Sequence, residues 1–305
     1  MLTIINTLVP IFFLILLGYF FKFIKFPHED FWKHLDKFNY FVLFPSLLVY
    51  KLSTANINEI KNFDFILVAI ISLLIISTIL IIYNKIKPYN DDAFTSIYQG
   101  AIRFNTYVFL ALVDTLFKDS GLIIAAILIT FLIPVINILC ITIFCLYIPN
   151  SKVTFVSFSK SIIKNPLILA CILGGSLNYF SFHLPLVLET TLSILSMAAL
   201  PLGLLSVGVG LHLSSINETK SELIVSSISK LILVPIVMFI VGNIFELEYI
   251  YVSILILFAA MPTAPSAYVL ARELGGDMKL ISSIISIQTI ISIVSISVFI
   301  QFIKI

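Results

Sequence analysis

The stretch "AAMPTAPSAYVLA", from Ala259 to Ala271, decides the fold of this chain because it interrupts a hydrophobic segment of membrane-spanning length. Pro262 and Pro265 lie three residues apart, with Thr263 between them. Each proline removes a helix hydrogen-bond donor and clashes with the preceding turn. An unpaired backbone group in lipid is costly, so such a break has to be protected by protein or face a wet cavity. We therefore predict an interrupted membrane helix here.

The composition of the chain is that of an integral membrane protein. Of the 305 residues, 60% are hydrophobic and only 11% are charged, and the mean hydropathy is +1.14. A soluble domain carries about a quarter charged residues. The net charge of +2 and the lack of a basic run with interleaved aromatics argue against nucleic acid as a partner, and we expect membrane lipid instead. Three cysteines lack metal-ligand spacing, so we interpret them as buried thiols and expect no metal or cofactor: Cys140, Cys145 and Cys171.

Apolar runs of about 20 residues, separated by short polar connections, recur along the whole chain. The first run lacks a basic start and a small-residue cleavage site, so we expect a membrane helix and not a cleaved signal peptide. The runs predict an all-α membrane protein with about ten transmembrane helices, at 3–23, 36–52, 63–83, 93–117, 122–148, 161–181, 186–213, 223–245, 249–274 and 280–303.

Basic residues fall mainly in alternate connections, which predicts the orientation of the chain. One set of connections holds thirteen of them: Lys22, Lys25, Lys33, Lys37, Lys85, Lys87, Lys152, Lys160, Lys164, Lys220, Lys230, Arg272 and Lys279. The other set holds four: Lys51, Lys61, Lys118 and Lys304. The richer set is expected in the cytoplasm. This predicts a multi-pass protein of the cell membrane with both termini outside, which agrees with an even number of spans.

The chain divides into two halves of five predicted spans, residues 1–150 and 151–305. An odd number of spans per half makes the second half inverted with respect to the first. Prolines and glycines of spans of equal rank match at an offset of 156: Pro10 with Pro166, Gly18 with Gly174, and Pro45 with Pro201. At an offset of 157, Asn105–Thr106 of the fourth span meets Pro262–Thr263 of the ninth. We therefore predict a five-plus-five inverted repeat with a second interruption in the fourth span.

The two interruptions predict an anion site. Asn105 or Thr106 can cap a half-helix that starts at Tyr107, and Thr263 or Ala264 can cap one that starts at Pro265. Ser266 follows in the first turn of that half-helix. Half-helix N-termini at mid-membrane carry partial positive charge that suits a carboxylate.

Arg103 lies about ten residues into its span, or roughly 15 Å from the surface. A charge at that depth normally faces a cavity or a partner, and guanidinium holds a carboxylate through two parallel hydrogen bonds. Simpler interpretations remain open. The proline pair could only kink a helix, Arg103 could snorkel or neutralise helix C-terminal carbonyls, and Asn105 could join two helices by a hydrogen bond.

Four other polar residues inside spans are secondary candidates for the site, each with an interhelical hydrogen bond as the alternative interpretation: Asn39, Ser46, Asn137 and Gln288. Gly208 and its neighbours Ser206 and Gly210 are interpreted as allowing close helix packing. No Asp or Glu lies in the middle of a span, which argues against a carboxylate proton relay. The sequence has no P-loop, HExxH or GxSxG motif, so we expect neither an ATP-driven pump nor an enzyme.

Four segments, "RFNTYVFLAL", "KNPLILACILGGSLN", "AALPLGLLSVGVGL" and "FAAMPTAPSAYVLA", resemble the auxin efflux carrier family in order and spacing. That family includes bacterial malate-permease-like proteins and plant PIN-type carriers, and is related in fold to bile acid:sodium symporters. The resemblance implies crossed, interrupted fourth and ninth helices around an organic anion, scaffold and transport domains with an elevator-like motion, and a homodimer. By position, the crossover residues are Asn105, Thr106, Pro262, Thr263 and Pro265. The short central loop differs from that of many plant carriers.

The sequence therefore predicts a secondary transporter or facilitator for small organic anions such as malate. Its predicted substrate-binding residues are Arg103, Asn105, Thr106, Pro262, Thr263, Pro265 and Ser266. The alternatives are an anion channel, a carrier of monocarboxylates or auxin-like acids, a sodium-coupled carrier of bile-acid-like anions, and a membrane receptor without transport activity.

Overall fold

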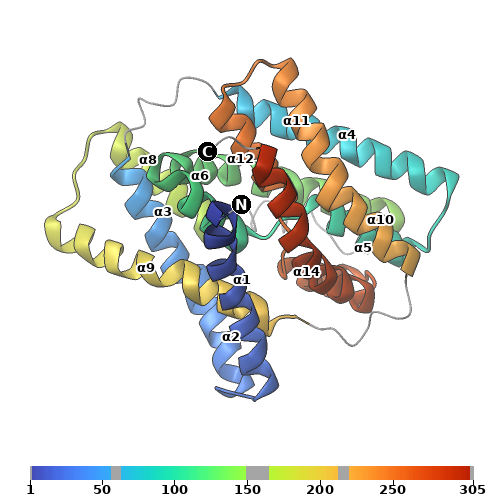
Figure 1. Cartoon of the computed structure of the whole chain (residues 1–305), viewed down its shortest axis with the longest axis horizontal. Coiled ribbons are helices and arrows are strands. Elements are labelled where there is room, and N and C mark those ends of the chain that lie inside the picture. The colour runs from blue at the N-terminus through green and yellow to red at the C-terminus, as the bar shows by residue number, and fades with distance from the viewer. Residues whose placement is uncertain (1, 56–62, 149–164, 212–219, 303–305) are drawn as a thin grey trace. The chain divides into compact units, whose positions relative to one another are not determined.

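The computed structural model describes residues 2–55, 63–148, 165–211 and 220–302, and every regular element in these ranges is a helix (Figure 1). Each of the ten stretches predicted to be apolar spans is mainly helical over its described residues. Among the described residues, five helical runs are long and apolar enough to cross a membrane, and shorter apolar helices accompany them. The topology of exactly ten crossings stays a prediction.

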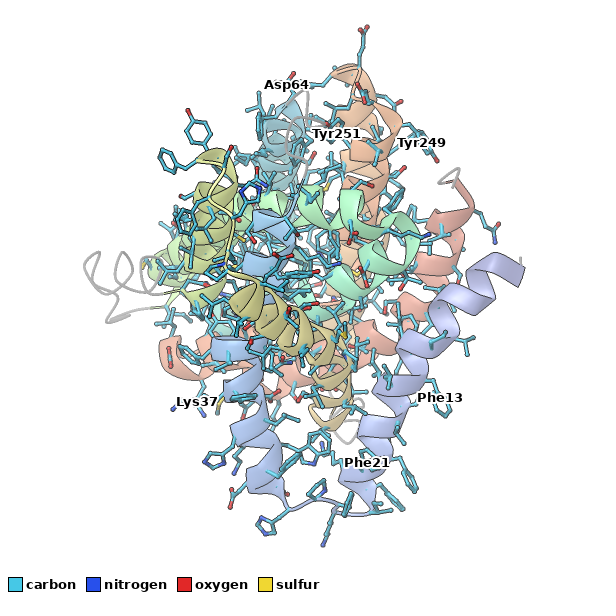
Figure 2. All side chains as sticks on the ribbon, turned by 90° about the vertical axis from the view of Figure 1, so that its left-hand side faces the viewer. Phe13, Phe21, Lys37, Asp64, Tyr249 and Tyr251 are labelled. Atoms are coloured by element: carbon cyan, nitrogen blue, oxygen red, sulfur yellow. The ribbon has the colours of Figure 1, made fainter. Side chains whose placement is uncertain are left out.

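Apolar side chains on the outside of the helices fit a lipid environment. Phe13 in the first helix is 61% exposed and points away from the ribbon in Figure 2. Leu16 and Phe20 on the same helix are also more than half exposed. In a soluble protein a surface of this kind would aggregate, whereas in lipid it costs nothing. The interpretation of all three cysteines as buried was wrong for Cys145, which is exposed, whereas Cys140 and Cys171 are buried.

The described residues fall into two compact units, each of which draws on both halves of the chain. The first unit comprises residues from 1–61, 110–130 and 155–210. Its elements are α1 (Leu2–Phe23), α2 (Glu29–Phe38), η1 (Asn39–Leu43), α3 (Phe44–Ser53), the middle of α6 (Thr106–Tyr147), α8 (Pro166–Tyr179) and α9 (Leu186–Val209). Within this unit α1 packs on α9, and α3 packs on both α8 and α9.

The contact between α1 and α9 depends on two glycines. A Cβ atom on Gly18 would lie 2.0 Å from the carbonyl oxygen of Leu205, and one on Gly208 would lie 1.9 Å from that of Ile15. Both obstacles are backbone atoms, which cannot move aside as a flexible side chain can. Small residues allow membrane helices to approach closely enough for van der Waals packing to hold them together. The interpretation of Gly208 as a packing residue is confirmed.

Replacing Gly208 with alanine should lower the free energy of unfolding by about 3 kcal/mol, because the added methyl group has to push two helix backbones apart. Unfolding of the purified protein in detergent, followed by circular dichroism, measures the change. Gly175→Ala in α8 is the matched control, since a Cβ there meets nothing within 4 Å. Equal stability of the two variants would contradict the close contact.

The second unit comprises residues from 62–109, 131–154 and 211–305. Its elements are α4 (Asp64–Ile86), α5 (Asp91–Ile102), both ends of α6, α10 (Lys220–Ile228), η3 (Ser229–Leu233), α11 (Val234–Ile244), α12 (Tyr249–Ala260), α13 (Ser266–Leu274) and α14 (Met278–Phe302). The starts of α4 and α12 lie at one end of this unit, where Asp64, Tyr249 and Tyr251 are labelled in Figure 2. There the rings of Phe65 and Tyr251 stack with centroids 5.0 Å apart.

In the described part of each unit there is a π-helix that a proline explains. Pro45 follows η1 and Pro235 follows η3 after one intervening residue. Because proline has no N–H, it leaves a carbonyl of the preceding turn without its usual partner. The chain relieves this with one wider turn, in which the N–H groups of Phe44 and Val234 donate to the residues five positions earlier, Asn39 and Ser229.

The structure corrects one residue of the predicted charge pattern. Lys230 was assigned to a cytoplasmic connection, but it lies in η3, inside a continuous helical run, with a fully buried side chain. The charge pattern failed here because Lys230 lies within the predicted span 223–245, where a basic residue says nothing about the charge of the connections. Five of the other basic residues used for the orientation lie outside the described residues: Lys61, Lys152, Lys160, Lys164 and Lys304.

Candidate functional site

The first interruption separates α5 from α6. α5 ends at Ile102, Arg103 and Asn105 have extended backbone, and α6 begins at Thr106. The side-chain oxygen of Asn105 accepts hydrogen bonds from the N–H groups of Tyr107 at 3.0 Å and Val108 at 3.2 Å. Asn105 is therefore the N-cap of this half-helix. It is one of the two residues predicted for that role, the other being Thr106. The cap also consumes two of the N–H groups that were expected to face an anion.

The second interruption separates α12 from α13. α12 ends at Ala260, and α13 begins at Ser266. The prediction that Thr263 or Ala264 caps α13 was wrong, because the cap position is Pro265 and no side chain bonds there. Thr263 is fully buried and turns inward. Its N–H donates to Oε1 of Gln288 at 3.0 Å, and its hydroxyl lies 2.7 Å from the carbonyl oxygen of Gly100 and 2.8 Å from the same Oε1.

The two interruptions contact each other. The N–H of Asn105 donates to the carbonyl oxygen of Pro262 at 2.7 Å. Next to this bond the rings of Phe104 and Phe258 lie with centroids 4.3 Å apart. The broken backbone of each helix thus supplies a hydrogen-bond partner for the other, which is how irregular backbone survives at membrane depth.

Gln288 of α14 ties this contact to the surrounding helices. Its amide nitrogen donates to the carbonyl oxygen of Gly100 at 2.9 Å and to Oγ of Ser226 at 3.2 Å, while its oxygen accepts from Thr263. The side chain is completely buried. Gln288 was a secondary candidate for the site, and the structure shows the alternative role of an interhelical hydrogen-bonding residue.

Arg103 lies at the first interruption with a side chain that is 9% exposed. One terminal nitrogen donates to Oγ of Ser266 at 3.1 Å and the other to Oδ1 of Asn137 at 2.7 Å. Both partners are neutral, and Nε has no hydrogen-bond partner in the described part of the chain. None of the three ion pairs between described residues includes Arg103. The guanidinium therefore carries a buried positive charge that no described carboxylate balances.

The structure thus brings together most of the predicted residues within the second unit. Ser266 is exposed, while Thr106 and Asn137 are half-buried, so the surroundings of Arg103 reach the surface. The secondary candidates of the first unit have other partners. The amide of Asn39 donates to the carbonyl oxygen of Ala199 at 3.2 Å, and Ser46 bonds within its own helix to Val42.

Sequence reasoning missed Gln99, one turn before Arg103. Its side chain is completely buried, and neither its amide nitrogen nor its oxygen has a hydrogen-bond partner among the described residues. A polar residue inside an apolar run is the signal that could have identified it, as it identified Asn137. A buried amide without a partner costs folding energy and is common where a ligand or water binds.

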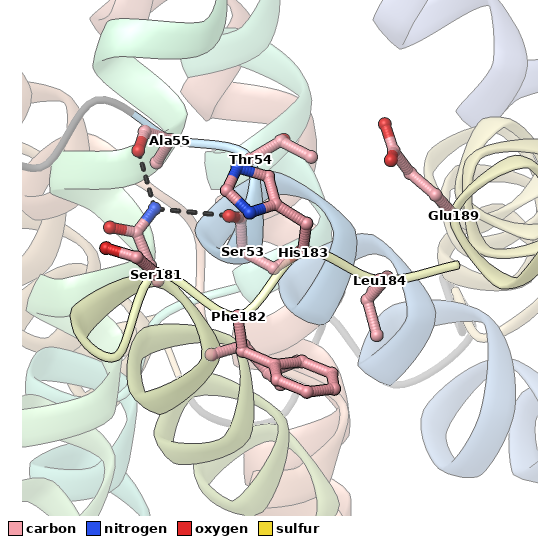
Figure 3. Close-up of a pocket in the computed structure, with 10 residues that line it drawn as sticks. Ser53, Thr54, Ala55, Ser181, Phe182, His183, Leu184 and Glu189 are labelled. Atoms are coloured by element: carbon pink, nitrogen blue, oxygen red, sulfur yellow. Dashed lines mark hydrogen bonds between the residues drawn. The ribbon is translucent and has the colours of Figure 1, made fainter. Parts of the chain in front are cut away.

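A separate polar cavity of about 360 Å³ lies in the first unit (Figure 3). Asn178 donates to the carbonyl oxygens of Ser53 at 3.2 Å and Ala55 at 2.5 Å, at the end of α3, and His183 and Glu189 also line the cavity. None of the predicted site residues lines it. Its acidic Glu189 disfavours an anion, so the cavity does not compete with the Arg103 site as a place for a carboxylate.

Comparison with known proteins identifies a family of transporters. The profile of the family described as membrane transport protein matches residues 3–300. A protein of Rhizobium meliloti (strain 1021) named "Putative malonate transporter" is 28% identical over 148 residues, which are 48% of this chain and 46% of that protein. A protein of Methanothermobacter thermautotrophicus named as an uncharacterized transporter is 33% identical over 106 residues, or 35% of each chain.

A further uncharacterized transporter, from Methanocaldococcus jannaschii, is 28% identical over 144 residues, which are 46% of this chain and 47% of that protein. The chain thus spans about half or less of the length of these curated relatives. The family profile, in contrast, extends over nearly the whole sequence. The chain therefore belongs to the membrane transport protein family, which is the auxin efflux carrier family that its motifs resemble.

Proposed function

We propose that this protein is a secondary transporter or facilitator that moves small carboxylate anions across the cell membrane. Malate is the substrate suggested by the resemblance, and the name of the Rhizobium relative adds malonate. Both are small dicarboxylates. The family is a transporter family and not an enzyme family, which leaves the substrate and the binding site as the proposed part.

The observation that carries the proposal is the unbalanced charge of Arg103. A guanidinium stays protonated in proteins, so the chain cannot avoid the cost of burying it by releasing a proton. Ser266 and Asn137 satisfy two of its donors but supply no negative charge. A carboxylate of the substrate would supply that charge and could form two parallel hydrogen bonds with the guanidinium.

The remaining site residues have supporting roles in this proposal. Thr106 is the first residue of α6, and its N–H is the one in the first turn that the cap by Asn105 leaves unbonded; we assign this N–H and the hydroxyl of Thr106 to the substrate. The side-chain nitrogen of Asn105 is buried without a hydrogen-bond partner in the described residues and is suited to a second substrate oxygen. Pro262, Thr263 and Pro265 hold the backbone open and do not themselves bind charge.

We further propose the topology of ten crossings as an inverted repeat of residues 1–150 and 151–305, with both termini outside. Two observations support it. The two helix interruptions fall in spans of equal rank, and they share one hydrogen bond. The second unit, which contains both interruptions, would be the transport domain of an elevator-like carrier, and the first unit would be the scaffold.

Substrate exchange in proteoliposomes tests the proposal. Vesicles loaded with unlabelled malonate or malate should take up labelled malonate from outside with saturable kinetics, because a carrier exchanges substrate faster than it returns empty. A panel with acetate, indole-3-acetate and taurocholate separates the dicarboxylate proposal from the alternative anions. Absence of exchange with every anion of the panel would refute the proposed function, and single-channel conductance would replace it with an anion channel.

A further inference from the structure

A second basic side chain is buried in the unit that contains Arg103. Lys230 lies in η3 and is 0% exposed. It is ten residues from the start of the helical run from Lys220 to Ile244, or about 15 Å along the axis. That depth is near the middle of a hydrocarbon core about 30 Å thick. An intramembrane ionisable residue of this kind is a candidate functional group.

The charged form of Lys230 has little to stabilise it. Its Nζ has no hydrogen-bond partner among the described residues, and no ion pair between them includes it. The ring centroid of Phe258 lies 5.6 Å from Nζ. An aromatic face offsets only part of the cost of removing an ammonium group from water. Unlike an arginine, a lysine can escape this cost by releasing its proton.

The elements that pack most closely on η3 do not supply a counter-charge; they are α5, α10, α11, α12 and α14. Asp91, Asp92, Glu222, Tyr249 and Lys279 lie in the first turns of their helices and are exposed or half-buried. Two titratable groups on these elements are buried and engaged elsewhere: the hydroxyl of Tyr98 lies 2.7 Å from Oγ of Ser77, and the ring of Tyr251 stacks on Phe65. α11 contains no titratable residue.

An aromatic pair connects Lys230 to the proposed anion site. Phe258, which lies beneath Nζ, packs against Phe104, and Phe104 is the neighbour of Arg103 in the first interruption. Two aromatic rings therefore lie on the path of contacts that leads from Lys230 to the first interruption. Charges separated by apolar side chains interact more strongly than across water, because neither solvent nor salt screens them well.

We infer that Lys230 binds a proton when an anion occupies the Arg103 site, and thereby couples anion transport to proton movement. The negative charge of the anion favours the ammonium form, and by reciprocity a proton on Lys230 raises the affinity for the anion. The lone pair of Nζ takes one proton from water on the side where the anion binds. The same proton returns to water on the side where the anion leaves, so one proton accompanies each anion. This inference rests on the proposed function.

Accumulation driven by a pH gradient tests the coupling. Proteoliposomes with the membrane potential clamped at zero receive labelled malonate at a pH gradient of one unit, acid outside. A one-to-one coupling should accumulate malonate about tenfold, because one pH unit equals a tenfold ratio of concentrations. A pH-sensitive dye inside the vesicles should report acidification that depends on malonate. Lys230→Met, which keeps the length of the side chain without its amine, should abolish accumulation and acidification while malonate exchange at equal pH continues.

The controls separate the coupling from the transport itself. Lys279→Met removes an exposed lysine of the same unit and should leave accumulation unchanged, and Lys230→Gln provides a second folded variant. Exchange by the wild type without accumulation, or accumulation that survives in Lys230→Met, would overturn the coupling and leave the proposed function intact. Failure of the wild type to exchange any anion of the panel would overturn the proposed function and the inference with it.

Discussion

Arg103→Gln should reduce the initial rate of malonate uptake into proteoliposomes by about 100-fold, which corresponds to about 3 kcal/mol of lost interaction. Glutamine keeps two hydrogen-bond donors but removes the buried charge. Its partners Ser266 and Asn137 are neutral and can bond to an amide, so the fold should persist. The decrease in uptake rate therefore measures what the positive charge of Arg103 contributes to transport of the substrate. A rate measurement over a range of malonate concentrations shows whether binding or turnover is affected.

Two further variants show whether the effect is specific to Arg103. Arg272→Gln alters the other arginine of the chain, which is exposed in the last turn of α13, and should change the rate less than twofold. Arg103→Lys keeps the charge but loses the planar fork, so an intermediate rate is expected. If Arg103→Gln takes up malonate at the rate of Arg272→Gln, Arg103 does not bind substrate. Its role would then be to neutralise the carbonyl groups at helix C-termini.

Gln288→Leu should lower the free energy of unfolding by about 4 kcal/mol. Its transport rate should fall in proportion to the fraction of protein that no longer folds. Leucine fills the space but leaves the N–H of Thr263, the carbonyl oxygen of Gly100 and Oγ of Ser226 without this partner. Each buried polar group without a partner costs about 1–3 kcal/mol. Thermal unfolding in detergent should show a midpoint lowered by about 10 °C.

The control for Gln288→Leu lies in the same helix. Gln301 is exposed near the end of α14, and Gln301→Leu should change the free energy of unfolding by less than about 0.5 kcal/mol. Similar midpoints for the two variants would mean that the hydrogen bonds of Gln288 do not hold the interruptions together. Rapid proteolysis near residues 100 and 263 in Gln288→Leu would locate the damage at the network.

The positions of the interruptions could be predicted because their causes are local. Pro262 and Pro265 lie three residues apart and together remove two helix hydrogen-bond donors from one turn, and Asn105 or Thr106 can cap the helix that follows. The role of Thr263 could not be predicted in the same way. Its hydroxyl can cap a helix or bond to another helix, and the outcome depends on whether Gln288 lies nearby. The residues next to Thr263 and Gln288 in the sequence do not show whether the two side chains meet.

The four secondary candidates show the same limit. As polar residues in apolar runs they carry equal signals in sequence, yet Asn137 contacts Arg103, Gln288 holds the interruptions together, Asn39 bonds to Ala199, and Ser46 bonds within its own helix. Lys230 is the clearest case. It lies eight residues after a predicted loop and was counted with the loop charges, whereas the packing of the surrounding helices on η3 buries it.

Hydropathy alone therefore locates the apolar helices, and Pro262 and Pro265 locate the second interruption, because both effects act on residues close together in the chain. The first interruption has no proline. It was predicted from Asn105–Thr106, either of which could cap the following half-helix, and from the match of this pair with Pro262–Thr263. The partners of the buried polar side chains come from three-dimensional packing. Arg103 and Ser266 are 163 positions apart, and Gln288 and Gly100 are 188 apart. No local pattern encodes contacts over such separations, since they depend on how complete helices pack, and this packing determines which polar groups remain available to a substrate.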